Sequence, residues 1–395
     1  MTPDGLTKGF WESRRKDENS MTRTSAVRSS ALRTVMAAMA VLIAGCGASP
    51  ESRPTPAEST SKVDAGTTAS TPQPSPIARL GDFPEFPQGP LPEHVAASLQ
   101  AVLEGAVERG LFVGLTATVI VADSGSWSGT TGVDDEGNPL TPDAQLPIAS
   151  VGKTIIAAQV LRLAERGKLG LDDPAADHLP RELESFDTND ATVRHLLSMR
   201  SGIPDLPLIT EPVPTATEFL KTFTDFRNFP AGSRIEYSNT NFVLLEVIIE
   251  RIARRPIEEV LQDDVLNGPG LDSLRQTATG SIDFDGVRES DSASLARWGY
   301  ELYGGFVLSD ASLRQMTDFR GEWYGLGAID FSQGTPAIVG GYGIPAIGHG
   351  GVGPSNAVML VAFPQAGVVV AVQAPIGTVP WVATVVGALR DAAQP

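Results

Sequence analysis

The 395-residue chain has a single cysteine, Cys46, so no disulfide can form within it. Histidine is almost as rare, with four in the whole chain. Three of them, His94, His178 and His195, show no spacing typical of metal ligands. The sequence therefore predicts no metal site and no cofactor.

Basic residues are also scarce. The chain has 30 Lys and Arg against 47 Asp and Glu, which gives a formal net charge of -17. A surface that binds nucleic acid needs an excess of Lys and Arg to neutralise phosphates, and the globular part has no basic cluster. The composition therefore argues against nucleic acid as a partner.

The apolar run near the N-terminus, residues 35–44, is too short to span a bilayer stably. Three arginines precede it and Gly45-Cys46 follows it, an arrangement typical of a secretory signal. The segment Ile43-Ala-Gly-Cys46 resembles a bacterial lipobox, in which the cysteine becomes the lipidated first residue of the mature chain. A free or buried thiol after an uncleaved anchor is the alternative.

These features predict three parts. Residues 1–45 form a signal segment, with Met21 as the true start. Residues 46–80 hold the lipidated Cys46 and a Ser/Thr/Pro linker that has too little apolar surface to fold, so we expect a disordered tether. Residues 85–395 form the globular domain. The expected location is the outer face of the bacterial cell membrane.

The globular part begins and ends with strands and helices of similar character. The pattern predicts a helix over 92–107, strands over 112–121 and 127–132, strands over 346–349, 356–363 and 368–373, and a closing helix over 381–392. Between 172 and 330 the pattern is mostly helical. This order predicts an α+β sandwich, in which an antiparallel sheet is built from both chain ends with flanking helices, beside a mostly helical lobe. A cleft between the two is the natural place for a site.

Ser150-Val-Gly-Lys153 is the most informative motif. Two other Ser-x-x-Lys matches occur near the N-terminus, but only this one precedes a run with helical periodicity, residues 154–166. A Ser and a Lys three residues apart lie on the same face of a helix, so the amine can reach the hydroxyl and take its proton. The alternative is that Ser150 only caps the helix N-terminus.

Two further motifs follow in order: Tyr237-Ser-Asn239 at the start of an expected helix, and His349-Gly350-Gly351 at the end of an expected strand. The sequence S-x-x-K, Y-x-N, [KH]-x-G resembles the signature of penicillin-recognising serine enzymes, of the class C β-lactamase, D-alanyl-D-alanine carboxypeptidase and esterase type. Similar blocks lie at 140–150, 195–204, 237–245 and 324–327. The resemblance runs from about residue 92 to 390 and implies a β-lactamase/transpeptidase-like fold over 85–395.

The resemblance implies roles for these residues. Ser150 attacks the substrate carbonyl. Lys153 and Tyr237 together act as the base, and either one can accept the proton. Asn239 donates its amide hydrogen to the substrate carbonyl and accepts from Lys153. The backbone N–H groups of Ser150 and Val352 form the oxyanion hole.

The third motif departs from the family pattern. His349 replaces the usual Lys, and Gly350 replaces the Thr or Ser whose hydroxyl helps to bind the substrate carboxylate. Gly350 and Gly351 let a substrate backbone lie close to the strand. A neutral imidazole and a missing hydroxyl make a weaker anion site. We therefore expect a neutral ester or amide, or a peptide whose carboxylate is held elsewhere, rather than a penicillin.

The expected function is that of a membrane-tethered serine hydrolase, an esterase or D-amino-acid peptidase, that forms an acyl-enzyme with a small-molecule or peptide substrate of the cell envelope. Its β-lactamase activity is expected to be weak or absent. A non-catalytic protein that binds peptidoglycan fragments is the alternative. An α/β-hydrolase is set aside, because no His follows the Ser of its near-match motif, Ser355. Specificity is expected to lie in the loops 203–231 and 278–293.

Overall fold

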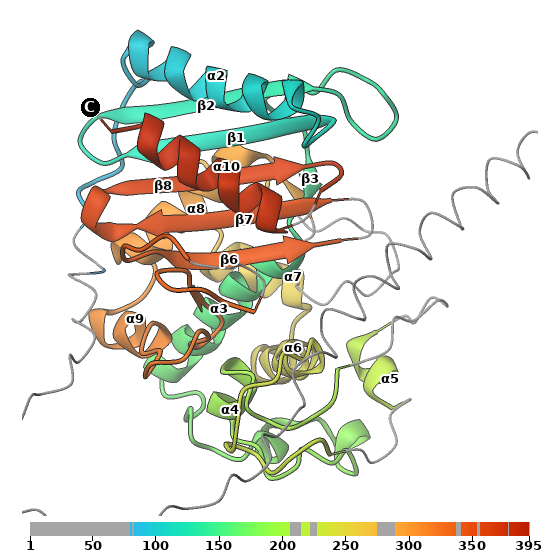
Figure 1. Ribbon diagram of the computed structural model, residues 1–395. Coiled ribbons are helices and arrows are strands. Elements are labelled where there is room, and N and C mark those ends of the chain that lie inside the picture. The colour runs from blue at the N-terminus through green and yellow to red at the C-terminus, as the bar shows by residue number, and fades with distance from the viewer. Residues whose placement is uncertain are drawn as a thin grey trace, which may run out of the picture. The chain divides into compact units, whose positions relative to one another are not determined.

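The structure is a computed structural model (Figure 1) that describes Leu80 and residues 83–394, except 206–214, 222–226, 275–288, 337–340, 354–355 and 378. The chain divides into two units, residues 1–70 and 71–395, and the described residues all belong to the second. The predictions made for the signal segment, for Cys46 and for the linker up to residue 79 lie outside the described residues. So does most of the two loops expected to set specificity.

A six-stranded sheet forms the centre of this unit (Figure 1). Its strand order is β2-β1-β8-β7-β6-β5, and every neighbouring pair is antiparallel. The strands are β1 (Gly114–Val121), β2 (Gly125–Gly132), β5 (Ile329–Asp330), β6 (Ile347–Val352), β7 (Ala357–Phe363) and β8 (Val368–Ala374). Because β1 pairs directly with β8, the front and the back of the chain share one sheet. The predicted fold class is confirmed.

Helices cover both faces of the sheet. In Figure 1, α2 (Glu93–Glu108) and α10 (Val379–Ala392) lie on one face, and α8 (Ser292–Gly304) lies on the other. This double cover explains why β7 and β8 are apolar runs rather than alternating ones, since all their side chains are buried. Both strands and both outer helices lie close to their predicted positions.

The middle of the chain is helical, as predicted. It contains α3 (Lys153–Glu165), α4 (Val193–Leu197), α5 (Ala216–Leu220), α6 (Thr240–Ala253), α7 (Ile257–Asp264) and α9 (Asp310–Met316). Short 3-10 turns lie at η1 (Ala149–Gly152), η2 (Ala175–His178), η3 (Arg181–Leu183) and η4 (Pro364–Ala366), and β3 (Leu146–Pro147) pairs with β4 (Glu289–Ser290).

Helix α3 is the buried axis of the helical part. Nearly all of its side chains are buried, and it packs against α6, α7, α9 and β6. At its C-terminal end, Asp264 of α7 accepts a hydrogen bond from Gln159 Nε2 at 3.0 Å and pairs with Arg166 at 2.7 Å. A helix held on all sides keeps the residues at its N-terminus in a fixed position.

Two predicted boundaries differ in the structure. The strand expected over 346–349 continues through the two glycines to Val352, because β7 pairs with its full length. Glycine is unfavourable in an isolated strand, which is why the sequence pattern ended the strand early. The helix expected to begin at Ser150 begins at Lys153, and Ser150 lies in η1 instead.

Two tyrosines of α8 offer a matched test of this packing. Tyr303 is fully buried, and its hydroxyl has no hydrogen-bond partner in the part of the chain that the structure describes. Tyr300 is also buried, but its hydroxyl donates to the Pro84 carbonyl at 2.9 Å. A buried polar group without a partner costs free energy, whereas a satisfied one contributes about 1 kcal/mol.

We therefore expect Tyr303→Phe to raise the free energy of unfolding by about 1 kcal/mol and Tyr300→Phe to lower it by a similar amount. Urea unfolding followed by circular dichroism measures both changes. Equal destabilisation by the two substitutions would contradict this description of α8.

Candidate active site

Ser150 and Lys153 meet at the start of α3. Lys153 Nζ donates a hydrogen bond to Ser150 Oγ at 3.0 Å. The Lys153 side chain is fully buried, whereas Ser150 is half-buried. The N-cap of α3 is Gly152, and no side chain makes a capping hydrogen bond there. The capping interpretation of Ser150 is therefore wrong, and its hydroxyl is bonded to an amine instead.

The backbone just before Ser150 is strained. Ala149 has φ +43°, in the left-handed region that non-glycine residues rarely adopt. Such a conformation costs on the order of 1–3 kcal/mol and persists only where the surrounding structure imposes it. Here it turns the chain from β3 into η1 and sets the direction of Ser150. No residue pattern in the sequence pointed to this strain.

Strand β6 passes close to the Ser150 amide. A Cβ atom added to Gly351 would lie 2.7 Å from the Ser150 nitrogen and 2.8 Å from Ala149 Cβ, closer than real contacts allow. Gly350 faces the other side of the strand, where a Cβ would meet Val379 Cγ1 at 3.3 Å. Val352 ends the strand one residue later. The glycine thus brings the strand beside the Ser150 N–H, and the oxyanion role of Ser150 and Val352 stays a prediction.

The ring of Tyr237 lies close to the lysine amine. Lys153 Nζ is 5.5 Å from the centre of the Tyr237 ring and 5.6 Å from that of Phe242 on α6. Aromatic faces attract a nearby cation, so the two rings help to hold the buried amine. The structure therefore brings Ser150, Lys153 and Tyr237 together from two separate segments of the chain.

Asn239 lies at the N-terminus of α6 and contacts a carboxylate that we did not predict. Its backbone N–H donates to Asp205 Oδ1 at 2.7 Å, and its side-chain Nδ2 donates to Oδ2 at 3.3 Å. The Pro204 carbonyl accepts from Thr240 Oγ1 at 2.7 Å, which fixes the same segment. Asp205 thus orients Asn239. The predicted contacts of Asn239 with Lys153 and with substrate stay predictions.

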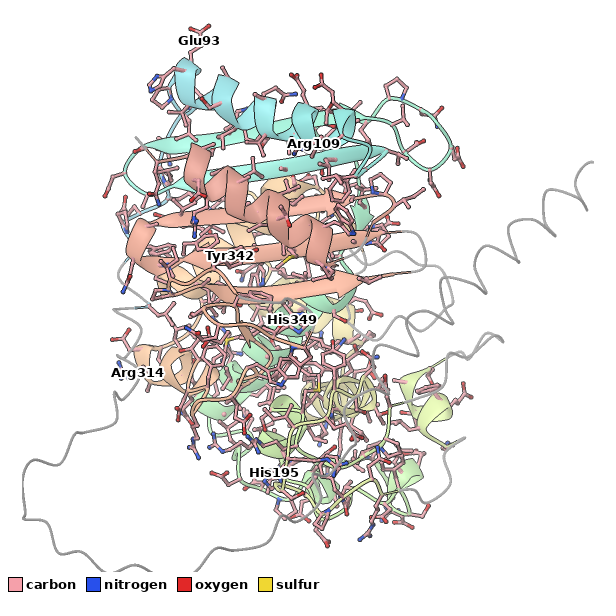
Figure 2. The ribbon with its side chains drawn as sticks, viewed as in Figure 1. Glu93, Arg109, His195, Arg314, Tyr342 and His349 are labelled. Carbon is pink, nitrogen blue, oxygen red and sulfur yellow. The ribbon has the colours of Figure 1, made fainter. Side chains whose placement is uncertain are left out.

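His349 is buried on β6, where Figure 2 labels it between the sheet and the helical part. Its Nδ1 lies 2.7 Å from the Gly350 carbonyl oxygen, and its Nε2 lies 3.2 Å from Tyr324 Oη. Burial, with the nearby charge of Lys153, lowers the pKa of His349 to about 3. The imidazole is therefore neutral near pH 7 and cannot form an ion pair with a substrate carboxylate.

Two of the other three histidines, His178 and His195, bond to neighbouring side chains or backbone. His195 completes a capping box with Thr192 at the start of α4, and His178 Nε2 lies 2.9 Å from Asp173. Among the described residues, no three His, Cys, Asp or Glu side chains cluster in a way that could hold a metal ion. Within the same residues, no helix combines the length and the apolar character needed to cross a membrane.

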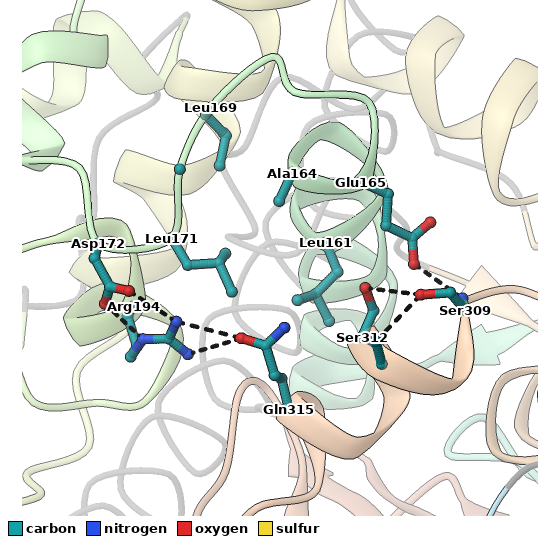
Figure 3. Close-up of a pocket in the computed structure, with 12 residues that line it drawn as sticks. Leu161, Ala164, Glu165, Leu169, Leu171, Asp172, Arg194, Ser309, Ser312 and Gln315 are labelled. Atoms are coloured by element: carbon teal, nitrogen blue, oxygen red, sulfur yellow. Dashed lines mark hydrogen bonds and ion pairs between the residues drawn. The ribbon is translucent and has the colours of Figure 1, made fainter.

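A cavity of about 590 Å³ lies away from Ser150 (Figure 3). One wall is the C-terminal part of α3. Its first lining residue, Leu161, lies about 12 Å along the helix from Lys153. The opposite walls are α9 and the segment 169–172, where Arg194 pairs with Asp172. Ser309 Oγ donates to Ser312 Oγ at 3.3 Å and the Ser309 backbone N–H donates to Glu165, and neither Ser150 nor Lys153 lines the cavity. This cavity is therefore not the catalytic site.

An antiparallel sheet with helices on both faces and a Ser-x-x-Lys pair at the start of a buried helix define a protein of the β-lactamase/transpeptidase fold. Residues 99–375 match the model of the family described as Beta-lactamase. The chain therefore belongs to the Beta-lactamase family.

The sequence identity to individual proteins is low. Protein flp of Staphylococcus aureus (strain MW2) is 24% identical over 176 residues, which are 42% of this chain and 35% of the relative. The chain thus aligns with about a third of the length of that relative.

Two solved structures share the fold. D-amino acid amidase from Ochrobactrum anthropi SV3, complexed with L-phenylalanine amide, superposes with a TM-score of 0.62 and 20% identity, covering 75% of this chain and 98% of the amidase. The octameric penicillin-binding protein homologue from Pyrococcus abyssi gives 0.61 and 21%, covering 74% and 76%.

The two glycines of β6 provide a matched test of this site. We expect Gly351→Ala to lower kcat/KM for a p-nitrophenyl ester by a hundredfold or more, because the new methyl group displaces the Ser150 amide. Gly350→Ala adds the same methyl group on the opposite face and should cost far less. Initial rates of ester hydrolysis measure the two effects, and thermal unfolding confirms that both variants fold. Equal losses in the two variants would show that the approach of β6 to Ser150 is unimportant.

Proposed function

We propose that this protein is an exported, lipid-anchored serine hydrolase that forms an acyl-enzyme at Ser150. The observation that carries the proposal is the 3.0 Å hydrogen bond between Lys153 Nζ and Ser150 Oγ, with the amine fully buried. Removing an amine from water is costly. A base held against a serine hydroxyl gives that burial a chemical use, whereas a binding protein has no need of it.

The proposed reaction proceeds in two halves. Ser150 Oγ attacks the substrate carbonyl carbon while its proton passes to the base formed by Lys153 and Tyr237. The carbonyl oxygen becomes an oxyanion that the backbone N–H groups of Ser150 and Val352 stabilise. The leaving amine or alcohol then departs with the proton, which leaves an ester on Ser150. Water hydrolyses this ester in the second half, aided by the same base.

The preferred substrate is a neutral ester or amide. The neutral His349 supports this choice, since an imidazole with a pKa of about 3 offers no positive charge to a carboxylate. The fold shared with a D-amino acid amidase and with a D-stereospecific amidohydrolase from Streptomyces is consistent with an amide. An esterase or D-amino-acid peptidase acting on a cell-envelope compound is therefore the finer form of the proposal.

The proposed location rests on the sequence of the N-terminal segment. The lipobox-like stretch before Cys46 supports lipidation at that cysteine, and residues 46–80 then supply a polar tether. Such an arrangement holds the enzyme at the outer face of the membrane, where envelope esters and peptides are found.

A substrate panel tests this function. We expect the protein to hydrolyse p-nitrophenyl esters or D-amino-acid amides, while nitrocefin and peptides ending in D-Ala-D-Ala react at least tenfold more slowly because they carry a carboxylate. Ser150→Ala should remove all turnover above background. If the protein binds muropeptides but turns over none of these compounds, the non-catalytic alternative is correct.

A further inference from the structure

Three aromatic rings form a buried cluster beside the Ser150–Lys153 pair. The Tyr324 ring lies 5.8 Å from the His349 ring at 87° and 6.0 Å from the Tyr237 ring at 84°, both edge-to-face. His349 and Tyr237 are 6.4 Å apart. Tyr324 comes from the segment between α9 and β5, so a third part of the chain reaches the site. Neither the family motifs nor our sequence prediction gives Tyr324 a role.

The hydrogen bonds of His349 determine which of its nitrogens carries the proton. The Gly350 carbonyl can only accept a hydrogen bond, so His349 Nδ1, 2.7 Å away, must be the donor. A neutral imidazole has one N–H, and Nε2 is therefore a bare acceptor. Tyr324 Oη, 3.2 Å from Nε2, must then donate its proton to it.

We propose that Tyr324 is a positioning residue that fixes His349 as its neutral Nδ1–H form. The phenol occupies the one lone pair through which the imidazole could act as a base. This proposal rests on the proposed hydrolase function, because the reason for fixing His349 is to hold β6 beside Ser150.

The ring of His349 lies among the groups of the proposed catalytic site. Lys153 on α3 and Tyr237 before α6 are the titratable groups that face His349 together with Tyr324, and the charge of Lys153 acts on the imidazole. Because the pKa of His349 is lowered to about 3, the imidazole is too weak a base to take the Ser150 proton. The hydrogen bond from Tyr324 instead fixes how the ring is oriented beside Lys153 and Tyr237.

The same bond shapes the strand. When Nδ1–H donates to the Gly350 carbonyl, the imidazole holds the peptide that precedes Gly351, the residue at which an added Cβ would lie 2.7 Å from the Ser150 nitrogen. A ring flip of His349 would break this contact and let β6 move. Tyr324 therefore acts through His349 on the strand that lies beside Ser150.

Tyr324→Phe tests the proposal, with Tyr342→Phe as the matched control. The Tyr342 hydroxyl donates a hydrogen bond too, to the Ala383 carbonyl at 2.9 Å, but this tyrosine lies against α10 and β7. We expect Tyr324→Phe to lower kcat for p-nitrophenyl butyrate roughly tenfold or more with KM little changed, because a buried acceptor loses its donor. Tyr342→Phe should keep the wild-type kcat.

A spectroscopic measurement separates positioning from general stability. With four histidines in the chain, the imidazole nitrogens can be assigned by ¹⁵N NMR using His349→Gln as reference. The wild type should show protonated Nδ1 and bare Nε2 at His349, and Tyr324→Phe should show a mixture of the two neutral forms or a charged ring at acidic pH. The donor hydrogen bond from Tyr324 favours the neutral form, so its loss should raise the pKa of His349.

The outcomes are distinct. If the wild-type His349 carries its proton on Nε2, or if Tyr324→Phe keeps both the wild-type kcat and the single neutral form, the proposal is wrong. If the wild type turns over no ester at all, the proposed function fails, and the NMR result still decides whether Tyr324 fixes the imidazole.

Discussion

A lysine side chain that is fully buried needs polar partners, and in this protein the partners of Lys153 organise the site. The amine donates to Ser150 Oγ at 3.0 Å and lies beside the rings of Tyr237 and Phe242. Burying such a group costs free energy unless its hydrogen bonds are made. The fold meets that cost by packing α3, α6 and β6 around the amine, which is fully buried, while Ser150 stays half-buried.

Several segments of the chain hold Ser150 and Lys153 in this arrangement. The sheet joins both chain ends, which brings β6 from near the C-terminus against η1 from the first half of the chain. Gly351 permits the approach, and the strained Ala149 is held in place by it. On the other side, Asp205 fixes Asn239 at the start of α6. The site is therefore built from segments that are distant in sequence.

The sequence predicted the parts of the structure that have local signals. Strands β7 and β8 are apolar runs, and Ser150, Lys153, Tyr237 and His349 belong to ordered motifs. What it could not predict depends on tertiary packing. The left-handed φ of Ala149 occurs where β6 packs against η1, and Gly350 and Gly351 resemble the end of a strand until β7 pairs with them.

Contacts between residues that are far apart in the sequence could not be predicted either. Asp205 and Asn239 are 34 residues apart, and Tyr324 and His349 are 25 apart, with no periodic pattern to relate them. The Tyr324 block was recognised as similar to the family, but only the structure shows its hydroxyl against His349 Nε2. Motifs thus predict the reacting groups, while the contacts of Asp205 and Tyr324 with them are visible only in the structure.

The most direct test of the acyl-enzyme mechanism is the site and rate of labelling by a fluorophosphonate, followed by intact mass and peptide mapping. The mechanism predicts one adduct per chain, on Ser150, with none in Ser150→Ala and a rate lowered about a hundredfold or more in Lys153→Met, since a positioned base contributes at least that factor. A wild-type protein that takes up no label, or that is labelled equally well after Ser150→Ala, would contradict it.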